Sequence, residues 1–194
     1  MERMITLKRL AVFFPGIGYT VDKPLMYYSR RLAETHGYEI RLVPYSGFPK
    51  KVRGDKDRMR ESYKTALCQS REMLSDIDFK EYGDILFVGK SIGTVAAAEI
   101  ASRSSASDRI RFILYTPLEQ AFSFPLQDAI AFTGSADPWV DEGRIPALCN
   151  QSGVPCSVIA NANHSLETGE PMQDLLTLRQ IMLETDQFIS KTNT

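Results

Sequence analysis

The sequence predicts an α/β fold, a three-layer doubly wound sandwich built on a mainly parallel sheet of six strands. Short apolar segments of strand length alternate along the chain with longer segments of helical periodicity, which is typical of βαβ units. The apolar run at 85–88 (ILFV) is unbroken, as expected for a strand buried on both faces of a parallel sheet. The chain has 194 residues, and this length predicts one domain over residues 1–194.

The first half of the chain opens with a strand at 9–15 (RLAVFFP), followed by a helix at 23–35. We expect Asp22 to be the N-cap of this helix and Pro24 to lie in its first turn. The helix is predicted to end at Gly37, because glycine readily takes the left-handed conformation that terminates helices.

The later elements continue the alternation of strand and helix. Residues 46–57 form a polar loop, and we interpret the charge-rich stretch 50–60 as a solvated loop and helix start rather than a binding patch, because both signs of charge are interspersed. The segment 117–128 is a connection too short for a separate domain. The remaining strands are expected at 38–44, 111–116, 129–133 and 154–160, and the remaining helices at 58–74, from Thr94 onward, at 142–150 and at 171–190.

Residues Gly89 to Gly93 (GKSIG) join the strand at 85–88 to the alanine-rich helix that begins at Thr94. They fit the pattern G-x-S-x-G, in which a serine stands on a sharp strand-to-helix turn above the helix N-terminus. Glycines are needed there because a side chain would obstruct the turn or the approach of the helix. The alternative, a phosphate-binding G-x-x-x-x-G-K-[ST] loop, requires glycine where this chain has Asp84, and a flexible loop in place of a hydrophobic strand.

Composition and charge argue against several classes of protein. The formal net charge is -1 at pH 7, which gives no indication of binding to nucleic acid or to an anionic membrane. No apolar run approaches the length of a membrane span, and the N-terminal MERMITLKRL lacks the apolar core and cleavage site of a signal peptide. Cys68, Cys149 and Cys156 have no C-x-x-C spacing, so we expect reduced thiols, packed as small apolar residues, in a cytoplasmic protein. With 2 histidines and no His/Cys cluster, we expect no metal site and no cofactor.

Functional groups of a parallel α/β sheet gather beyond the carboxyl ends of its strands. Four loops follow strands in this chain and carry reactive or backbone-exposing residues: PGIGYT, GKSIG, GSADPWV and NANHS. The last three contain, in order, Ser91, Asp137 and His164. This order of nucleophile, acid and histidine resembles that of the α/β-hydrolase family. The resemblance covers nearly the whole chain and implies a small, minimal member with the sheet order 2-1-3-4-5-6 and a catalytic triad of these three residues.

The chemistry of the three side chains agrees with these roles. A serine hydroxyl becomes a useful nucleophile when a neighbouring base takes its proton. His164 is the expected base, because the other histidine, His36, lies at the far end of a helix. Asp137 would hold the imidazole in the correct tautomer and stabilise the imidazolium. Asp141 is a nearby substitute, but the acid of this family lies a few residues after the strand, which favours Asp137.

The resemblance also implies an oxyanion hole formed by the backbone N–H groups of Ile92 and Ile17. Gly18 is the alternative donor in the PGIGYT loop, because this chain has Pro15–Gly16 where many lipases and esterases carry His-Gly. A simpler interpretation of PGIGYT is a tight connector.

Side chains near the strand ends are candidates for a substrate pocket. Lys90 could attract an acidic substrate, but we favour a solvated lysine, because exposure is the default for this residue type. Aromatic side chains near strand ends pack as often as they recognise ligands. The short connection 117–128 predicts little or no lid and an open cleft. The candidate pocket residues are Gly16, Gly18, Tyr19, Lys90, Tyr115, Phe122, Phe124 and Trp139.

We therefore expect a cofactor-independent serine hydrolase that cleaves small carboxylic esters, thioesters or related acyl compounds through an acyl-enzyme intermediate. Two alternatives remain open. One is a binding or scaffold protein that keeps the fold without useful activity, and the other is an acyltransferase or peptidase that uses the same three residues.

Overall fold

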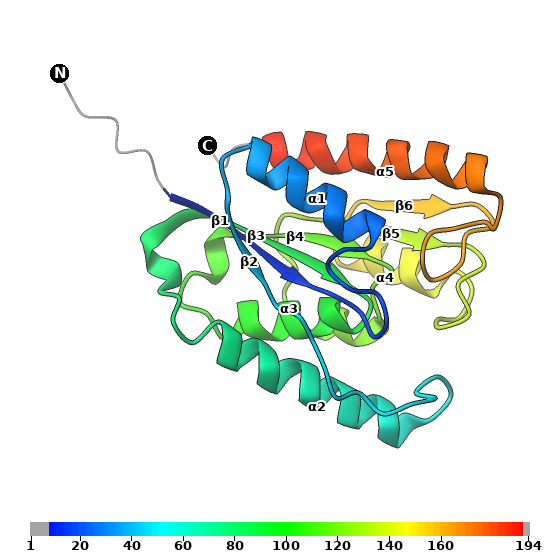
Figure 1. Cartoon of the computed structure of the whole chain (residues 1–194), viewed down its shortest axis with the longest axis horizontal. Coiled ribbons are helices and arrows are strands. Elements are labelled where there is room, and N and C mark those ends of the chain that lie inside the picture. Colours follow the sequence, from blue (N-terminus) through cyan, green and yellow to red (C-terminus); the bar gives the residue numbers. More distant parts are fainter. Residues whose placement is uncertain (1–7, 192–194) are drawn as a thin grey trace.

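A six-stranded parallel sheet forms the centre of the molecule. The computed structural model describes residues 8–191, and its strands lie in the order β2-β1-β3-β4-β5-β6 (Figure 1). Every neighbouring pair is parallel. The predicted fold class and sheet order are therefore confirmed. The strands are β1 (Lys8–Phe14), β2 (Glu39–Leu42), β3 (Tyr82–Lys90), β4 (Ile110–Tyr115), β5 (Ala129–Gly134) and β6 (Cys156–Ile159).

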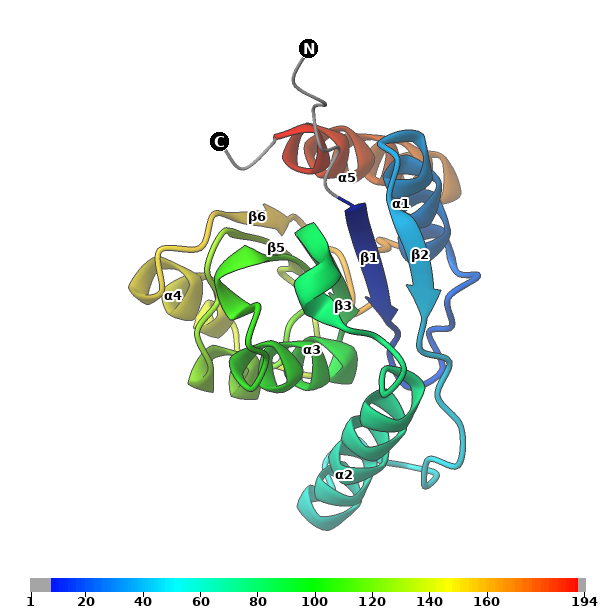
Figure 2. The same cartoon turned by 90° about the vertical axis from the view of Figure 1, so that its left-hand side faces the viewer.

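Helices cover both faces of this sheet, so the protein has three layers. One layer consists of α1 (Pro24–Thr35) and α5 (Pro171–Ser190), which lie side by side (Figures 1 and 2). The other face carries α2 (Lys56–Met73), α3 (Ile92–Ser102) and α4 (Arg144–Gln151). Two separate clusters of buried apolar residues fill the spaces between the sheet and each layer.

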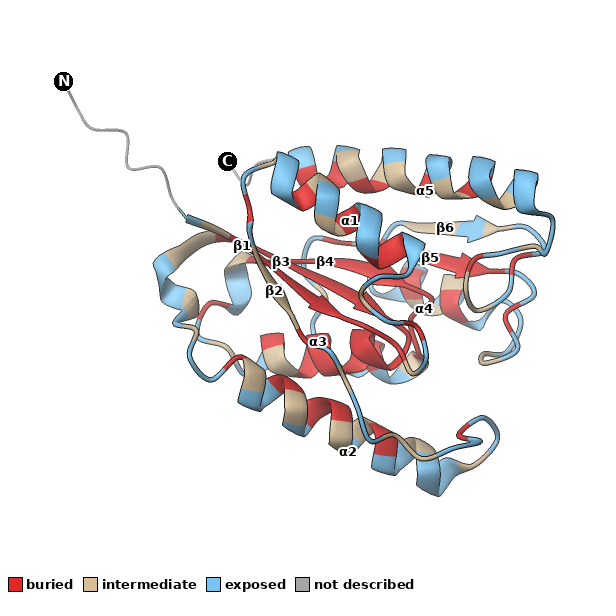
Figure 3. Cartoon of the chain, in the orientation of Figure 1, coloured by how far each residue is buried: buried red, intermediate tan, exposed pale blue. Residues whose placement is uncertain are grey.

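The most deeply buried elements are the central strands and α3. β4 is buried along its whole length, and β3 is buried from Asp84 to its end at Lys90 (Figure 3). In α3 the small side chains of Ala96, Ala97 and Ala98 are fully buried. A helix that is apolar on all sides packs as a core element, so α3 is held firmly at the end of β3, where the serine motif lies.

Three sequence-based expectations need correction. β3 continues to Lys90 and does not end at Val88. The N-cap of α1 is Lys23, without a side-chain cap, because the chain enters the helix one residue after Asp22. α2 begins earlier than predicted, since the side chain of Asp55 caps it by accepting from the N–H groups of the second and third residues that follow. The expected left-handed glycine after α1 is confirmed, with a φ of 78° at Gly37.

The cysteines are free thiols, and their burial differs from one to the next. Cys149 is buried and Cys156 is half-buried, but Cys68 is exposed on α2, so the prediction of apolar packing is wrong for Cys68. Within residues 8–191 no helix is long and apolar enough to cross a membrane. Most of the N-terminal stretch in which we found no signal peptide, residues 1–7, lies outside the described residues.

Candidate active site

Ser91 stands on a sharp turn between β3 and α3, in a backbone conformation that non-glycine residues rarely adopt. Its φ is 55° and its ψ is -122°. Such strain persists only where the surrounding structure enforces it. The Ser91 N–H donates to the Tyr115 carbonyl at 3.0 Å, and the Ser91 carbonyl accepts from the N–H of Thr94 at 2.9 Å. The turn is therefore held from both sides, and it presents the hydroxyl beyond the end of the sheet.

The two glycines of the motif are required by close approach of the backbone. A Cβ at Gly89 would lie 2.8 Å from the Cα of Thr94. A Cβ at Gly93 would lie 2.1 Å from the carbonyl oxygen of Phe14 at the end of β1. Both distances are shorter than any normal carbon contact, so only glycine lets α3 pack this closely on the sheet.

The imidazole of His164 lies between the side chains of Ser91 and Asp137. Its Nε2 is 2.7 Å from the Ser91 Oγ, and its Nδ1 is 2.6 Å from the Asp137 Oδ2. The loop that carries His164 follows β6 and is anchored at its backbone, because the His164 carbonyl accepts from the Thr116 hydroxyl at 3.2 Å. Three residues that are far apart in the sequence therefore form one continuous chain of hydrogen bonds.

Asp137 is enclosed, and both of its carboxylate oxygens have partners. Its side chain is only 1% exposed. One oxygen contacts His164, and the other accepts from the Trp139 N–H at 2.9 Å. The indole of Trp139 also stacks on the imidazole, with ring centroids 5.2 Å apart. Trp139 therefore covers the pair of Asp137 and His164 and fixes the ring orientation.

The alternative residues considered from the sequence do not take part in this chain. His36 pairs with Asp186 on α5, with its Nε2 2.8 Å from the carboxylate. Asp141 is exposed and lines the neighbouring cleft. His164 and Asp137 are thus the histidine and the carboxylate that the fold brings to Ser91.

The environment of His164 favours the neutral imidazole. Burial lowers the pKa of His164 below its ordinary value of 6.5, and the nearby positive charge of Lys90 lowers it further, against the opposing effect of Asp137. A neutral ring at pH 7 has a free lone pair. Nε2 can therefore accept a proton from the serine hydroxyl.

Lys90 is buried, which corrects the interpretation of this residue as solvated. It is 1% exposed, and its Nζ lies 4.9 Å above the ring centroid of Tyr19. The cause is the extra length of β3, because alternation along the strand directs Lys90 to the same face as Val88, under α1 and α5. Burial lowers the pKa of Lys90 to about 7, although the carboxylates of Asp137 and Glu167 oppose this shift.

Replacing Lys90 by methionine is expected to stabilise the protein below pH 7, and this gain is expected to shrink as the pH rises. Below about pH 7 the amine is protonated in the folded and unfolded chains, so the cost of burying its charge is fully present. At higher pH the folded wild type loses this proton, whereas the unfolded chain keeps it to about 10.5. The unfolded state then binds more protons, so wild-type stability rises, by about 3 kcal/mol between about pH 7 and 9.5.

Urea unfolding of wild type and Lys90→Met at several pH values measures this difference. Lys64→Met is a matched control, because Lys64 is an exposed lysine on α2. A stability difference between wild type and Lys90→Met that does not change with pH would contradict a buried, titrating amine.

Two parts of the backbone near Ser91 have N–H groups that could bind an oxyanion. Ile92 is the first residue of α3, so its N–H has no acceptor within the helix. The loop after β1 closes on itself through two hydrogen bonds between Gly16 and Tyr19, which leave the N–H groups of Ile17 and Gly18 outside the pair. This loop lies against the serine, because a Cβ at Gly16 would be 3.3 Å from the Ser91 Cβ. The choice of Ile17 over Gly18 as a donor stays a prediction.

Three other predicted pocket residues, Tyr115, Phe122 and Tyr19, do not line the large cleft beside this site. Tyr115 is fully buried, and its hydroxyl bonds to Ser29 and Thr185, so it belongs to the core and the pocket prediction is wrong for it. Phe122 packs against the core on the α3 side and does not line the cleft. Tyr19 is buried too, and its hydroxyl accepts from the N–H of Leu25.

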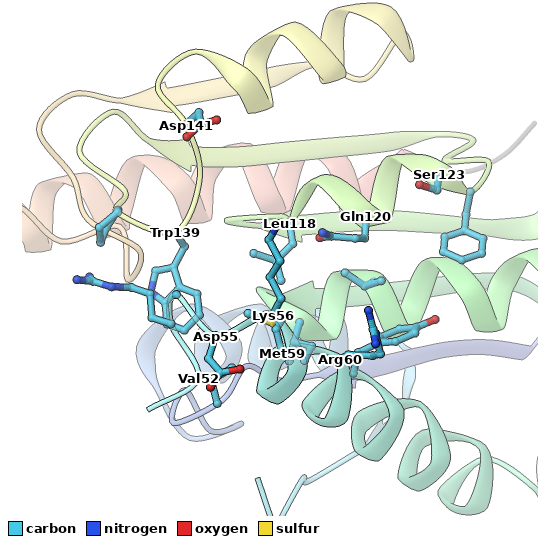
Figure 4. Close-up of a pocket in the computed structure, with 17 residues that line it drawn as sticks. Val52, Asp55, Lys56, Met59, Arg60, Leu118, Gln120, Ser123, Trp139 and Asp141 are labelled. Carbon is cyan, nitrogen blue, oxygen red and sulfur yellow. The ribbon is translucent and has the colours of Figure 1, made fainter. Parts of the chain in front are cut away.

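A large cleft of about 1130 Å³ lies beside this site, although none of the three residues lines it. Figure 4 shows the side chains that do. The cleft begins at Ile92, next to the serine, and at Trp139, whose ring stacks on His164. One wall comes from the start of α2 and the loop before it, and the opposite wall from the short 3-10 helix η3 (Glu119–Ser123). Its lining residues are Val52, Arg53, Gly54, Asp55, Lys56, Met59, Arg60, Tyr63, Ile92, Val95, Leu118, Gln120, Ser123, Phe124, Pro138, Trp139 and Asp141.

Sequence reasoning missed the wall formed by residues 52–63. The charges of this segment favoured a solvated interpretation, and its side chains are indeed mostly exposed, but they face the cleft. The spacing of Met59 and Tyr63, four residues apart on one helix face, was the signal that could have indicated it. As for metals, no group of three or more His, Cys, Asp or Glu side chains in residues 8–191 could hold an ion.

Comparison with known proteins gives a result at the level of structure. No family model and no curated protein matches the sequence. Solved structures do match. An esterase of Pyrococcus furiosus has a TM-score of 0.63 at 13% identity, over 95% of this chain and 83% of that one. An α/β serine hydrolase homologue from Coxiella burnetii has a TM-score of 0.57 at 17% identity, over 90% and 85%.

A mouse protein, α/β-hydrolase domain-containing protein 10, matches with a TM-score of 0.62 at 11% identity, over 92% of this chain and 88% of that one. The chain has the α/β-hydrolase fold. In the α/β-hydrolase fold the nucleophile stands on the strand-to-helix turn at the top of the sheet, which is the position that Ser91 occupies between β3 and α3.

Proposed function

We propose that this α/β-hydrolase-fold protein is a serine hydrolase that cleaves small carboxylic esters, thioesters or related acyl compounds. One observation carries the proposal: a single imidazole lies within hydrogen-bond distance of a serine hydroxyl and of a buried carboxylate. Nucleophile, base and orienting group in contact are the geometry needed to activate a serine. The strained backbone of Ser91 supports the same role, because strain of this kind is concentrated at functional sites.

In the first half of the reaction, the Ser91 Oγ attacks the substrate carbonyl carbon while its proton passes to His164 Nε2. Asp137 stabilises the imidazolium that forms. Negative charge develops on the former carbonyl oxygen, and the N–H groups of Ile92 and Ile17 would receive it. As the intermediate collapses, the imidazolium gives its proton to the leaving alcohol or thiol, and an acyl group remains on Ser91.

The second half repeats these steps with water as the nucleophile. His164 takes a proton from the water, whose oxygen attacks the acyl carbon. The tetrahedral intermediate then collapses, the proton returns to the Ser91 Oγ, and the carboxylic acid leaves. The cover that Trp139 provides keeps water from competing for the hydrogen bond between Asp137 and His164, which strengthens this bond through a low local dielectric.

The short connection beside the cleft supports short or water-soluble substrates. The connection between β4 and β5 contains only the five-residue helix η3, and this helix forms one wall of the cleft. Nothing larger from this connection covers the cleft. A volume of about 1130 Å³ lies at the upper end of the range of ligand sites, roughly 300–1,000 Å³, so the cleft can hold a short acyl group together with a larger leaving group.

A fluorophosphonate probe tests the proposal directly. Wild type is expected to react with an alkyl fluorophosphonate at Ser91, with the modified peptide located by mass spectrometry, and to hydrolyse 4-nitrophenyl butyrate. Ser91→Ala is expected to remain unlabelled. If wild type neither reacts with the probe nor turns over short esters or thioesters, the proposed function is wrong, and the fold serves binding.

A further inference from the structure

We infer that the cleft binds acyl substrates carrying an anionic group, a carboxylate or a phosphate, through the side chains of Arg53 and Lys56. This inference rests on the proposed function, because it names the class of ester or thioester that Ser91 would attack. The reacting carbonyl lies at Ser91, an apolar part of the substrate lies along the cleft floor, and the anion lies at the wall formed by the start of α2.

Two of the cations on this wall, Arg53 and Lys56, have no ion-pair partner in the part of the chain that the structure describes. On α2, in contrast to Lys56, three of the four other cations form ion pairs within residues 8–191, namely Arg58, Arg60 and Arg71. Lys56 extends from the start of α2 across the cleft towards Leu118, as Figure 4 shows. A cation that reaches across an open cleft is available to a ligand that enters it.

The acidic residues of the cleft do not cancel these charges. Asp55 caps α2 and pairs with Arg58 at 3.1 Å, so its charge is already compensated. Arg60 is loosely paired with Asp57 at 3.6 Å. Asp141 is the one remaining carboxylate among the residues that line the cleft. Two unpaired cations against one unpaired carboxylate leave a local positive charge, although the whole chain has a net charge of -1.

An apolar surface lies beside these cations and continues to Ile92, the residue that follows the serine. Ile92 directly follows Ser91 and lines the cleft together with Val95 and Leu118. Apolar side chains from the α2 wall complete this surface, with Met59 half-buried against the same core. A ligand that fills the cleft therefore meets hydrocarbon near the reacting atom and positive charge at one wall. This arrangement fits an acyl compound with one anionic end.

Two pairs of substrates test the inference and separate its two anion sources. For the carboxylate, 4-nitrophenyl hydrogen glutarate is compared with 4-nitrophenyl valerate, which has the same leaving group and no acid. For the phosphate, butyryl-coenzyme A is compared with S-butyryl-N-acetylcysteamine, which has the same acyl group and no phosphate. In at least one pair, after correction for uncatalysed hydrolysis, kcat/KM is expected to be roughly threefold to tenfold higher for the anionic member at low salt.

Substitution of Lys56 and Arg53 tests whether these two cations cause the preference for an anionic substrate. Lys56→Met and Arg53→Gln are each expected to remove a large part of the anionic preference, measured as the ratio of kcat/KM for the anionic member to kcat/KM for its neutral partner. Lys64→Met, an exposed lysine on the same helix that does not line the cleft, is the control and should change neither value. The preference should also weaken with added NaCl, since the Debye length falls from about 10 Å at 0.1 M to about 3 Å at 1 M.

The outcomes separate this inference from the proposed function. If the neutral esters are hydrolysed but both anionic substrates are equal to or worse than their partners, the inference is overturned and the proposed function stands. The inference is also overturned if an anionic preference exists and survives both substitutions. If no substrate is hydrolysed and the fluorophosphonate does not react, the failure lies with the proposed function.

Discussion

Asp137→Asn is expected to lower kcat for ester hydrolysis about 10⁴-fold while the protein stays folded. The Asp137 carboxylate accepts a hydrogen bond from the Nδ1–H of His164, with the two atoms 2.6 Å apart. The ring proton is therefore on Nδ1, and Nε2, which faces Ser91, is left without a proton. An asparagine amide can donate to Nδ1, which places the ring proton on Nε2. The imidazole then cannot take the proton of the serine hydroxyl.

Asp141→Asn is the matched control for this substitution. Asp141 lies four residues further along the same loop and lines the cleft, but it does not contact His164. Its replacement should change kcat by less than a few-fold, with circular dichroism showing that both variants are folded. If kcat falls tenfold or less in Asp137→Asn but strongly in Asp141→Asn, the acid is Asp141 and the assignment to Asp137 is wrong.

Gly93→Ala is expected to destabilise the protein by more than about 4 kcal/mol, or to prevent folding, a loss above the roughly 1–3 kcal/mol that an extra methylene in a packed core typically costs. The added methyl group would lie 2.1 Å from the carbonyl oxygen of Phe14 and 2.5 Å from that of Pro15. Both atoms belong to the backbone at the end of β1, so no side chain can turn away to make room. Either α3 moves away from the sheet or the end of β1 shifts.

Gly153→Ala provides the comparison. Gly153 has a φ of 67°, so alanine there is strained, but its Cβ would have no heavy atom within 4 Å. Its cost should be about 1 to 2 kcal/mol from the left-handed conformation alone. Urea unfolding compares the two variants. A loss at Gly93 no larger than the loss at Gly153 would show that the packing of α3 on β1 tolerates an extra carbon.

The sheet and the serine turn could be predicted because local signals specify them. The unbroken apolar run of β3, the two glycines around Ser91 and the alanines of α3 all lie within one short stretch, and each has a physical reason that can be read from its residue type. The meeting of Ser91, Asp137 and His164 could be expected because parallel strands bring their carboxyl ends to one edge.

Other features depended on information that the sequence does not carry locally. The burial of Lys90 follows from the length of β3 and from the loop that brings Tyr19 over it. The role of residues 52–63 as a cleft wall follows from how α2 packs on α3, which is a tertiary contact. Tyr115 is a different case. Strand alternation places it on the face under α1 and α5, so the period of the strand would have excluded it from the pocket.

The cleft wall at the start of α2 and the side chains proposed to react come from different parts of the fold. The side chains that we propose to react are carried by the loops after strand ends. Residues 52–63 instead belong to the loop before α2 and the first turns of α2, a helix that projects beside the sheet and rests mainly on α3 (Figure 2). Exchanging that helix start for another sequence would alter which compounds are admitted without moving the hydroxyl, the imidazole or the carboxylate. Selectivity and reactivity can therefore evolve, or be engineered, independently in this molecule.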